Sequence, residues 1–301
     1  MNEKIKWYAF LVLICVLFGT QSPALKVLSS SFSPFQLSFY RFLFASLALV
    51  PFFLLHNRKK KVGIKPAFGI AIVGLIGIAL YSIINIFGIK LSTAINQSIL
   101  VNTWPIFLVA LAPIVIKEKV YKRAALGITV GFFGVLVTLA GKGNPIDIFK
   151  TDYFFGNLLI LTSSLCLAFY YMLGKKYVQD YGSLTVTFYA VIAGTILLFL
   201  SALASGNIFN PELLRLKIFL ILLWVAVPTT AFTWVMVFKS MEKIGIVETS
   251  SFFSAIPIFG VLFSNLLLQE KITPFSLAGA LFVAFGVYLV QTKRNMRPVI
   301  E

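Results

Sequence analysis

The 301-residue sequence has few of the side chains on which enzymes depend. It contains one histidine, two cysteines and ten acidic residues. An enzyme embedded in a membrane needs a nucleophile with a base, a metal cluster or paired acids. The two cysteines stand half a chain apart, and no acid falls in the middle of an apolar run. We therefore expect no enzyme, no metal site and no bound cofactor.

Charge of either sign is also scarce. Only 12% of the residues are charged, 59% are apolar, and the mean hydropathy is +0.95. A soluble protein carries about twice that charged fraction. Apolar runs of roughly 20 residues recur along the chain, and each is long enough to cross the hydrocarbon layer as a helix. These runs are apolar all round, unlike the alternating strands of a membrane barrel. The expected fold class is an all-α integral membrane protein.

The apolar runs predict ten transmembrane helices, separated by short segments that contain proline or glycine. The first run is too long for a cleavable signal peptide. Cys15 and Cys166 lie inside two of the runs, where we expect reduced thiols packed as small apolar side chains. The predicted helices cover about 7–28, 35–55, 67–89, 93–116, 121–140, 154–176, 183–204, 217–238, 244–268 and 274–292.

The 26 basic residues outnumber the acidic ones and give a net charge of +16. They lie in short connections between the helices rather than on one face, so we do not expect nucleic-acid binding. With the N-terminus in the cytoplasm, 18 basic residues fall on the cytoplasmic side and 7 on the outer side. This bias predicts cytoplasmic N- and C-termini for a multi-pass protein of the cytoplasmic (inner) membrane, with the lipid bilayer as its surroundings.

An internal repeat with a shift of 152 residues is the most informative pattern. Pro-Ile-Phe at 105–107 recurs at 257–259, and Glu-Lys at 118–119 recurs at 270–271. Ten of the 31 positions from 105 to 135 are identical at this shift, where chance would give on the order of three. Five helices per copy place the second copy in the membrane in the opposite orientation. The prediction is an inverted 5+5 repeat, with copies at 1–141 and 154–292, a linker at 142–153 and a tail at 293–301.

Several motifs resemble those of the ten-helix EamA-type carriers in the drug/metabolite transporter superfamily. Phe-Gly-Thr-Gln at 18–21, followed by Lys26, is similar to the family's Trp-Gly-Ser-Asn…Lys pattern, and Tyr-Arg-Phe at 40–42 contains its Arg-Phe pair. Asn-Thr-Trp-Pro at 102–105 is similar to the Tyr-Leu-Trp-Pro segment of aromatic amino-acid exporters, with asparagine in place of tyrosine. The resemblance covers almost the whole chain. It implies transport of amino acids, metabolites or small drugs, often as export.

Large polar side chains inside the helices are the candidates for a binding site. Such side chains are costly in lipid unless they face a cavity or a partner helix, and inverted repeats place their site near the bilayer midplane. Hydrogen bonding between helices is the alternative role, and for the serines of the second copy and both tryptophans it is equally open. The expected substrate-binding residues are Gln21, Tyr81, Asn85, Ser98, Asn102, Trp104, Tyr170, Trp234, Ser250 and Ser254.

Arg41 is the only basic residue that falls well within a predicted helix. It can bind a substrate carboxylate or serve as a gate, snorkel to the outer interface, or hold a carbonyl across the helix gap. We favour the structural roles over direct binding. Glu118 and Glu270 are expected to cap the helices predicted at 121–140 and 274–292, since carboxylates stabilise helix N-termini. A gating role for these two acids is the minority alternative.

The sequence lacks the groups that usually couple transport to protons or to ATP, which limits the possible energy sources for transport. Glu248 is the acid nearest to mid-span, and no phosphate-binding Gly-Lys-Ser/Thr loop occurs. We hypothesise a secondary transporter, working as an exporter or uniporter, that moves a small amino acid or related zwitterionic or neutral metabolite by alternating access. Proton-coupled drug or metabolite efflux, through Glu248 or a proton on the substrate, is the alternative. A channel and a non-transporting scaffold are alternatives from other classes, and both a monomer and a homodimer are open.

Overall fold

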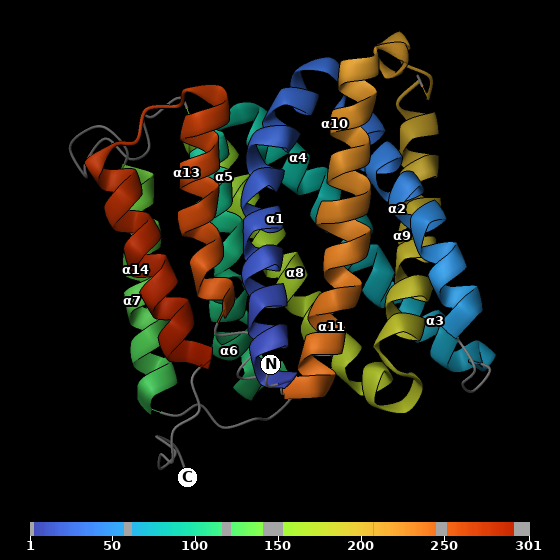
Figure 1. The fold of residues 1–301 in the computed structure, drawn as a ribbon, viewed down its shortest axis with the longest axis horizontal. Helices are drawn as coiled ribbons and strands as arrows, with labels where there is room; N and C mark the ends of the chain where they lie inside the picture. Colours follow the sequence, from blue (N-terminus) through green and yellow to red (C-terminus); the bar gives the residue numbers. More distant parts are fainter. Residues whose placement is uncertain are drawn as a thin grey trace.

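The computed structural model describes residues 3–56, 62–115, 122–140, 153–206, 208–244 and 252–291. Within these ranges every regular element is helical. Eight helices are long and apolar enough to cross a membrane, and Phe253–Leu268 and Pro274–Val290 are two shorter apolar helices. The all-α class with ten membrane helices is confirmed, and Figure 1 shows them packed side by side as one bundle. Glu118, Glu248 and Ser250 lie outside the described residues.

The first copy of the repeat forms five membrane segments, of which the third and fourth are interrupted. They are α1 (Glu3–Ser31), α2 (Pro34–His56), α3 (Ile64–Gly74) with the π-helical η1 (Leu75–Leu80) and α4 (Tyr81–Leu91), α5 (Ala94–Leu100) with the 3₁₀ segment η2 (Val101–Thr103) and α6 (Trp104–Val115), and α7 (Lys122–Ala140).

The second copy forms the matching five segments in the same order. They are α8 (Phe154–Tyr181), α9 (Ser183–Ala204), α10 (Leu216–Ala226) with the π-helical η5 (Val227–Phe232) and α11 (Thr233–Ile244), the 3₁₀ segment η6 (Phe253–Ala255) with α13 (Ile256–Leu268), and α14 (Pro274–Gln291). A short 3₁₀ turn, η4 (Pro211–Leu214), precedes α10. α8 extends five residues beyond the predicted end at 176.

Local side-chain chemistry sets where several helices begin. Ser33 and Gln36 form a reciprocal capping box at the start of α2, with N–H···O distances of 3.1 and 3.2 Å. Thr93 caps α5 by accepting a hydrogen bond from the amide of Asn96 at 3.0 Å. Gly182 separates α8 from α9 with a φ of 81°, a conformation that glycine adopts at no steric cost. These short breaks allow neighbouring helices to run in opposite directions.

The packing between the copies has two-fold symmetry. α1 of the first copy packs against α13, and its counterpart α8 packs against α5 and α6. α4 packs against α8, and correspondingly α10 and α11 pack against α1. The equivalent pairs α2–α9 and α7–α14 lie against each other, as Figure 1 shows for α7 and α14. Because each contact has its symmetric partner, the copies form one interleaved bundle rather than two separate domains.

The helix interruptions obey the same repeat. The π-helical segments η1 and η5 begin at 75 and 227, and the 3₁₀ segments η2 and η6 begin at 101 and 253. Both pairs are offset by 152 residues, which is the shift found in the sequence. π-helical and 3₁₀ interruptions within helices free backbone groups from the regular α-helical pattern and are frequent at functional sites. The symmetry therefore extends to these four interruptions of the described helices.

The glycines of α7 and α14 serve packing within the chain. A Cβ atom at Gly134 would lie 2.7 Å from the amide nitrogen of Val283, and one at Gly286 would lie 2.6 Å from the Cα of Gly131. Only glycine permits this approach between the two helices. These surfaces are covered by each other, so they are not available to a second copy of the protein.

Candidate functional site

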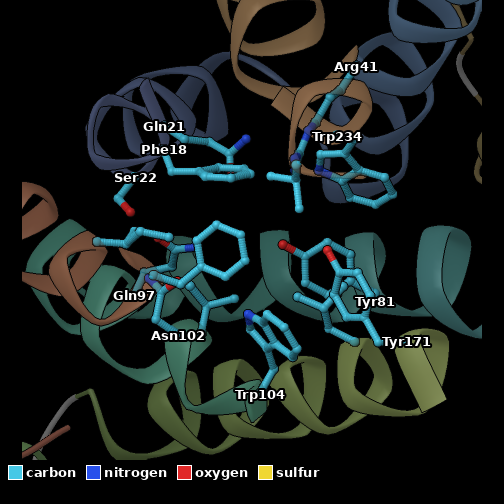
Figure 2. A pocket seen from close by; sticks show the side chains of 15 residues that line it. Phe18, Gln21, Ser22, Arg41, Tyr81, Gln97, Asn102, Trp104, Tyr171 and Trp234 are labelled. Atoms are coloured by element: carbon cyan, nitrogen blue, oxygen red, sulfur yellow. The ribbon is translucent and has the colours of Figure 1, made fainter. Parts of the chain in front are cut away.

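A cavity, shown in Figure 2, lies between the copies. Its lining includes residues of η2 and η6, together with Tyr81 directly after η1 and Trp234 two residues after η5. It encloses about 600 Å³ of space not filled by atoms, part of it open to solvent. Side chains from α1, α2, α4, α5, α8 and α11 meet there with residues in or next to η2 and η6. The lining residues are Phe18, Gln21, Ser22, Arg41, Tyr81, Gln97, Val101, Asn102, Trp104, Leu167, Tyr171, Trp234, Val237, Phe253 and Ile256.

The π-helical segment η5 anchors two polar side chains of the cavity. Gln21 Nε2 donates to both the carbonyl and the hydroxyl oxygen of Thr229, each at 3.0 Å. Arg41 Nε donates to the hydroxyl of Thr230 at 3.1 Å. The Thr230 hydroxyl in turn donates to the carbonyl of Val225 at 2.8 Å, five residues earlier. The irregular backbone thus holds side chains from α1 and α2 in place.

Arg41 is fully buried, with 1% of its surface exposed. Its guanidinium lies over the Phe42 ring at 5.0 Å from the centroid and interacts with the hydroxyl of Tyr81. Figure 2 shows its side chain extending toward the cavity. Of the alternatives for Arg41, snorkelling to the interface is wrong, because the side chain is buried and its charged end meets η5 instead.

Aromatic rings form much of the remaining wall. Trp104 stacks on Tyr171 with ring centroids 4.4 Å apart. Trp234 lies 5.6 Å from the ring of Tyr170 and 6.1 Å from that of Phe42. Such pairs hold large flat surfaces in fixed orientations, so the cavity offers rigid aromatic faces to whatever it binds.

Gln97 is held by a chain of hydrogen bonds that fixes its orientation. The Ser163 hydroxyl donates to the carbonyl of Ile160 at 2.7 Å and therefore accepts from Asn85 Nδ2 at 3.0 Å. Asn85 must then turn its oxygen to Gln97, whose Nε2 donates to it at 3.2 Å. The amide of Gln97 consequently faces Asn85 with its nitrogen, which leaves its Oε1 as the free acceptor.

The cavity brings six of the sequence-predicted residues together and leaves four described ones outside. Ser98 packs against Gly260, where an added Cβ would lie 2.3 Å from the Ser98 Cβ. Asn85 is buried behind Gln97, and Tyr170 packs against Gly77 in η1. Ser254 is half-buried and does not line the cavity. The six that line it are Gln21, Arg41, Tyr81, Asn102, Trp104 and Trp234.

Glu270 caps a different helix from the one expected. Its carboxylate accepts hydrogen bonds from the amides of Ala94 and Ile95, at 2.8 and 2.9 Å, at the N-terminus of α5. The start of α14 is instead capped by Thr273, whose hydroxyl accepts from the amide of Ser276 at 3.1 Å. The expectation failed because the connection from α13 to α14 brings Glu270 against a helix of the other copy. The carboxylate therefore meets the N-terminal amides of α5, where a helix dipole favours negative charge.

Sequence reasoning missed Gln97 and Tyr171 among the large polar lining residues. Both are large polar residues within predicted helices, so the criterion that selected Asn102 also applied to them. The repeat, which maps Ser98 onto Ser250, ranked Ser98 above Gln97, although one residue along a helix turns the side chain by about 100°. Among the described residues, no three His, Cys, Asp or Glu side chains gather as metal ligands.

Comparison with known proteins assigns the chain to a family. The EamA-like transporter family matches it twice, at residues 5–140 and 154–292. The chain belongs to the EamA-like transporter family. An uncharacterized transporter of Archaeoglobus fulgidus is 29% identical, with 98% of this chain and 100% of that protein aligned. The uncharacterized transporter YyaM of Bacillus subtilis is 26% identical over 95% of this chain and 93% of its own length.

More distant matches agree with this family. A chloroplastic WAT1-related protein of Arabidopsis thaliana is 25% identical over 91% of this chain and 66% of its own length. A crystal structure with 13% identity superposes with a TM-score of 0.66 and covers 93% of this chain and 94% of its own. That structure shares the overall fold of this chain. The protein is therefore a multi-pass membrane transporter.

Proposed function

We propose that this transporter is a secondary carrier that moves a small zwitterionic or neutral metabolite, such as an amino acid, out of the cell by alternating access. The observation that carries the proposal is the symmetric placement of η1, η2, η5 and η6 around one cavity. A carrier needs two equivalent arrangements, each open to one side, and inverted copies can exchange conformations to supply them. Residues Gln21, Arg41, Tyr81, Asn102, Trp104 and Trp234 are the proposed substrate contacts.

The lining supports uniport without direct proton coupling. Proton relays inside membranes usually depend on an acid or a histidine, and the described lining residues include neither. We further propose cytoplasmic N- and C-termini in the cytoplasmic membrane, from the distribution of basic residues.

A metabolite screen followed by reconstitution tests the proposal. The compounds released by cells that overproduce the protein are compared with those released by cells that lack it. Candidates are then measured in proteoliposomes for saturable flux and for counterflow, in which internal unlabelled substrate accelerates entry of the labelled compound. Asn102→Ala is expected to lower this flux. Counterflow supports the carrier, whereas flux that rises linearly with concentration and shows no counterflow supports a channel.

A further inference from the structure

One buried positive charge in the cavity has hydrogen-bond donors left over. Arg41 carries five N–H donors. Its Nε donates to Thr230, its guanidinium meets the hydroxyl of Tyr81, and its Nη1 has no hydrogen-bond partner among the described residues. A buried cation is costly unless it is paired and hydrogen-bonded. The protein thus keeps a fixed, incompletely satisfied guanidinium at the wall of its central cavity.

The described wall offers Arg41 no counter-ion. Of the 15 described residues that line the cavity, none is acidic and Arg41 is the only charged one. Hydroxyl groups such as those of Thr230 and Tyr81 orient the guanidinium but leave its charge uncompensated. A planar guanidinium matches a carboxylate through two parallel N–H···O bonds. An anionic group on the bound molecule would supply the missing partner.

A second unpaired polar group at the cavity wall is a hydrogen-bond acceptor rather than a donor. Gln97 lines the cavity, and its Oε1 is buried without a hydrogen-bond partner in the part of the chain that the structure describes. The chain through Asn85 and Ser163 fixes this amide so that the oxygen is the atom left over. Gln97 is therefore an acceptor that awaits a donor, while Arg41 is a donor that awaits an acceptor. Together, the two unpaired groups fit a ligand that carries a hydrogen-bond acceptor for Arg41 and a hydrogen-bond donor for Gln97.

We propose that the substrate is a carboxylate that binds Arg41 and that also carries a hydrogen-bond donor, an ammonium, hydroxyl or amide N–H, which meets Gln97. The inference rests on the proposed carrier function and narrows it, because it removes neutral compounds and simple amines from the substrate class. The aromatic faces of Trp104 and Tyr171 cover the apolar body of the ligand. Arg41 is a binding residue in this scheme, and Asn85 positions Gln97.

Matched ligands test the proposal without any mutation. The purified protein is titrated with the standard amino acids and the corresponding 2-hydroxy acids, and with the primary amide and the decarboxylated amine of each. Binding is measured by thermal stabilisation. We expect at least one carboxylate to bind and its amide and amine to bind at least tenfold more weakly. Binding of no carboxylate in the panel, or equal binding of an acid and its amide, would overturn the proposal.

Variants assign the preference to the two residues. Arg41→Gln is expected to abolish the preference for acid over amide, and Arg41→Lys to keep it with weaker binding, since the charge remains but the planar fork is lost. Gln97→Leu is expected to weaken the binding of an amino or hydroxy acid without changing that of the analogue lacking the donor. Arg215→Gln, whose side chain is 72% exposed beside Glu212, is the charge-matched control. A preference that persists in Arg41→Gln would refute the assignment.

The same preparation separates this inference from the carrier function. Proteoliposomes loaded with a metabolite extract are tested for exchange of each ligand. Exchange of other metabolites without carboxylate binding overturns the inference and leaves the carrier intact. Selective carboxylate binding without any exchange leaves the binding site intact and overturns the carrier.

Discussion

The Nζ atom of Lys26 lies 2.8 Å from the carbonyl oxygen of Ile89, at the end of α4. The same ammonium also donates to the carbonyl of Ser92. Directly after this turn, Glu270 accepts from the first amides of α5. One basic and one acidic side chain, each from another part of the bundle, therefore hold the α4–α5 turn from both helix ends. Cations favour helix C-termini and anions favour N-termini, so both contacts have the stabilising sign.

Removing the ammonium should weaken this end of the bundle. Lys26→Met keeps the length of the side chain but removes the ammonium donor from the carbonyls of Ser92 and Ile89, of which Ile89 keeps only the amide of Ser92 at 3.3 Å. The expected loss of stability is about 1–3 kcal/mol, the cost of unsatisfied buried polar groups. Thermal unfolding in detergent measures it, with Lys90→Met as control because Lys90 is exposed next to the same turn. Equal melting temperatures for the two variants would mean that the contact contributes nothing.

The π-helical segment η1 depends on a glycine at its contact with α8. A Cβ at Gly77 would lie 2.2 Å from Cδ2 of Tyr170, 2.3 Å from its Cβ and 2.4 Å from its Cγ. Gly77→Ala is expected to cost about 1–3 kcal/mol through overpacking. Gly174→Ala is the matched control, since its nearest atom would be 3.7 Å away. The comparison is made by thermal unfolding, and a Gly77→Ala protein as stable as Gly174→Ala would contradict this packing.

The stacked tryptophan of the cavity should matter for transport rather than for folding alone. Trp104→Ala removes the ring that stacks on Tyr171 and is expected to lower counterflow at least tenfold. Trp104→Phe, which keeps an aromatic face, should restore part of it. Trp224 provides the control, because it is 43% exposed and lies outside the cavity. Similar transport by the Trp104→Ala and Trp224→Ala proteins would argue that the cavity is not the path.

Proton coupling gives a separate prediction. We expect an imposed pH gradient to leave the final distribution of substrate across a proteoliposome membrane unchanged at zero membrane potential. Glu248→Gln should then transport at the rate of the unmodified protein. Uphill accumulation of substrate driven by the pH gradient, together with its loss in the Glu248→Gln protein, would contradict uniport and indicate proton-coupled efflux.

Much of the fold follows from the sequence, because each membrane helix has a strong local signal. The lengths of the apolar runs predicted ten helices, and the repeated segments after Pro105 and Pro257 indicated the two copies. The cavity was harder to predict, since its lining depends on which way each side chain points after the helix is interrupted. Gln97 and Ser98 are neighbours in sequence, yet one lines the cavity and the other packs against Gly260.

Contacts between the copies were the least predictable feature. Nothing near Glu270 in the sequence indicates that its carboxylate meets Ala94, because that contact exists only once the two copies interleave. The burial of Arg41 has the same origin, since its partner Thr230 lies 189 residues away. Local patterns predict elements, whereas such pairs depend on how the elements pack.

Sided labelling of a single cysteine in the cavity tests the central claim most directly. Ser22 lines the cavity, and both natural cysteines are buried. Ser22→Cys is made in a background in which alanine replaces both of them, so that its labelling reports on the cavity alone. Membrane-impermeant thiol reagents are applied to oriented vesicles from either side. Alternating access predicts slow labelling from both sides, with a bound substrate slowing each reaction. Labelling from one side only, or from neither, would contradict a cavity that opens in turn to the two faces of the membrane.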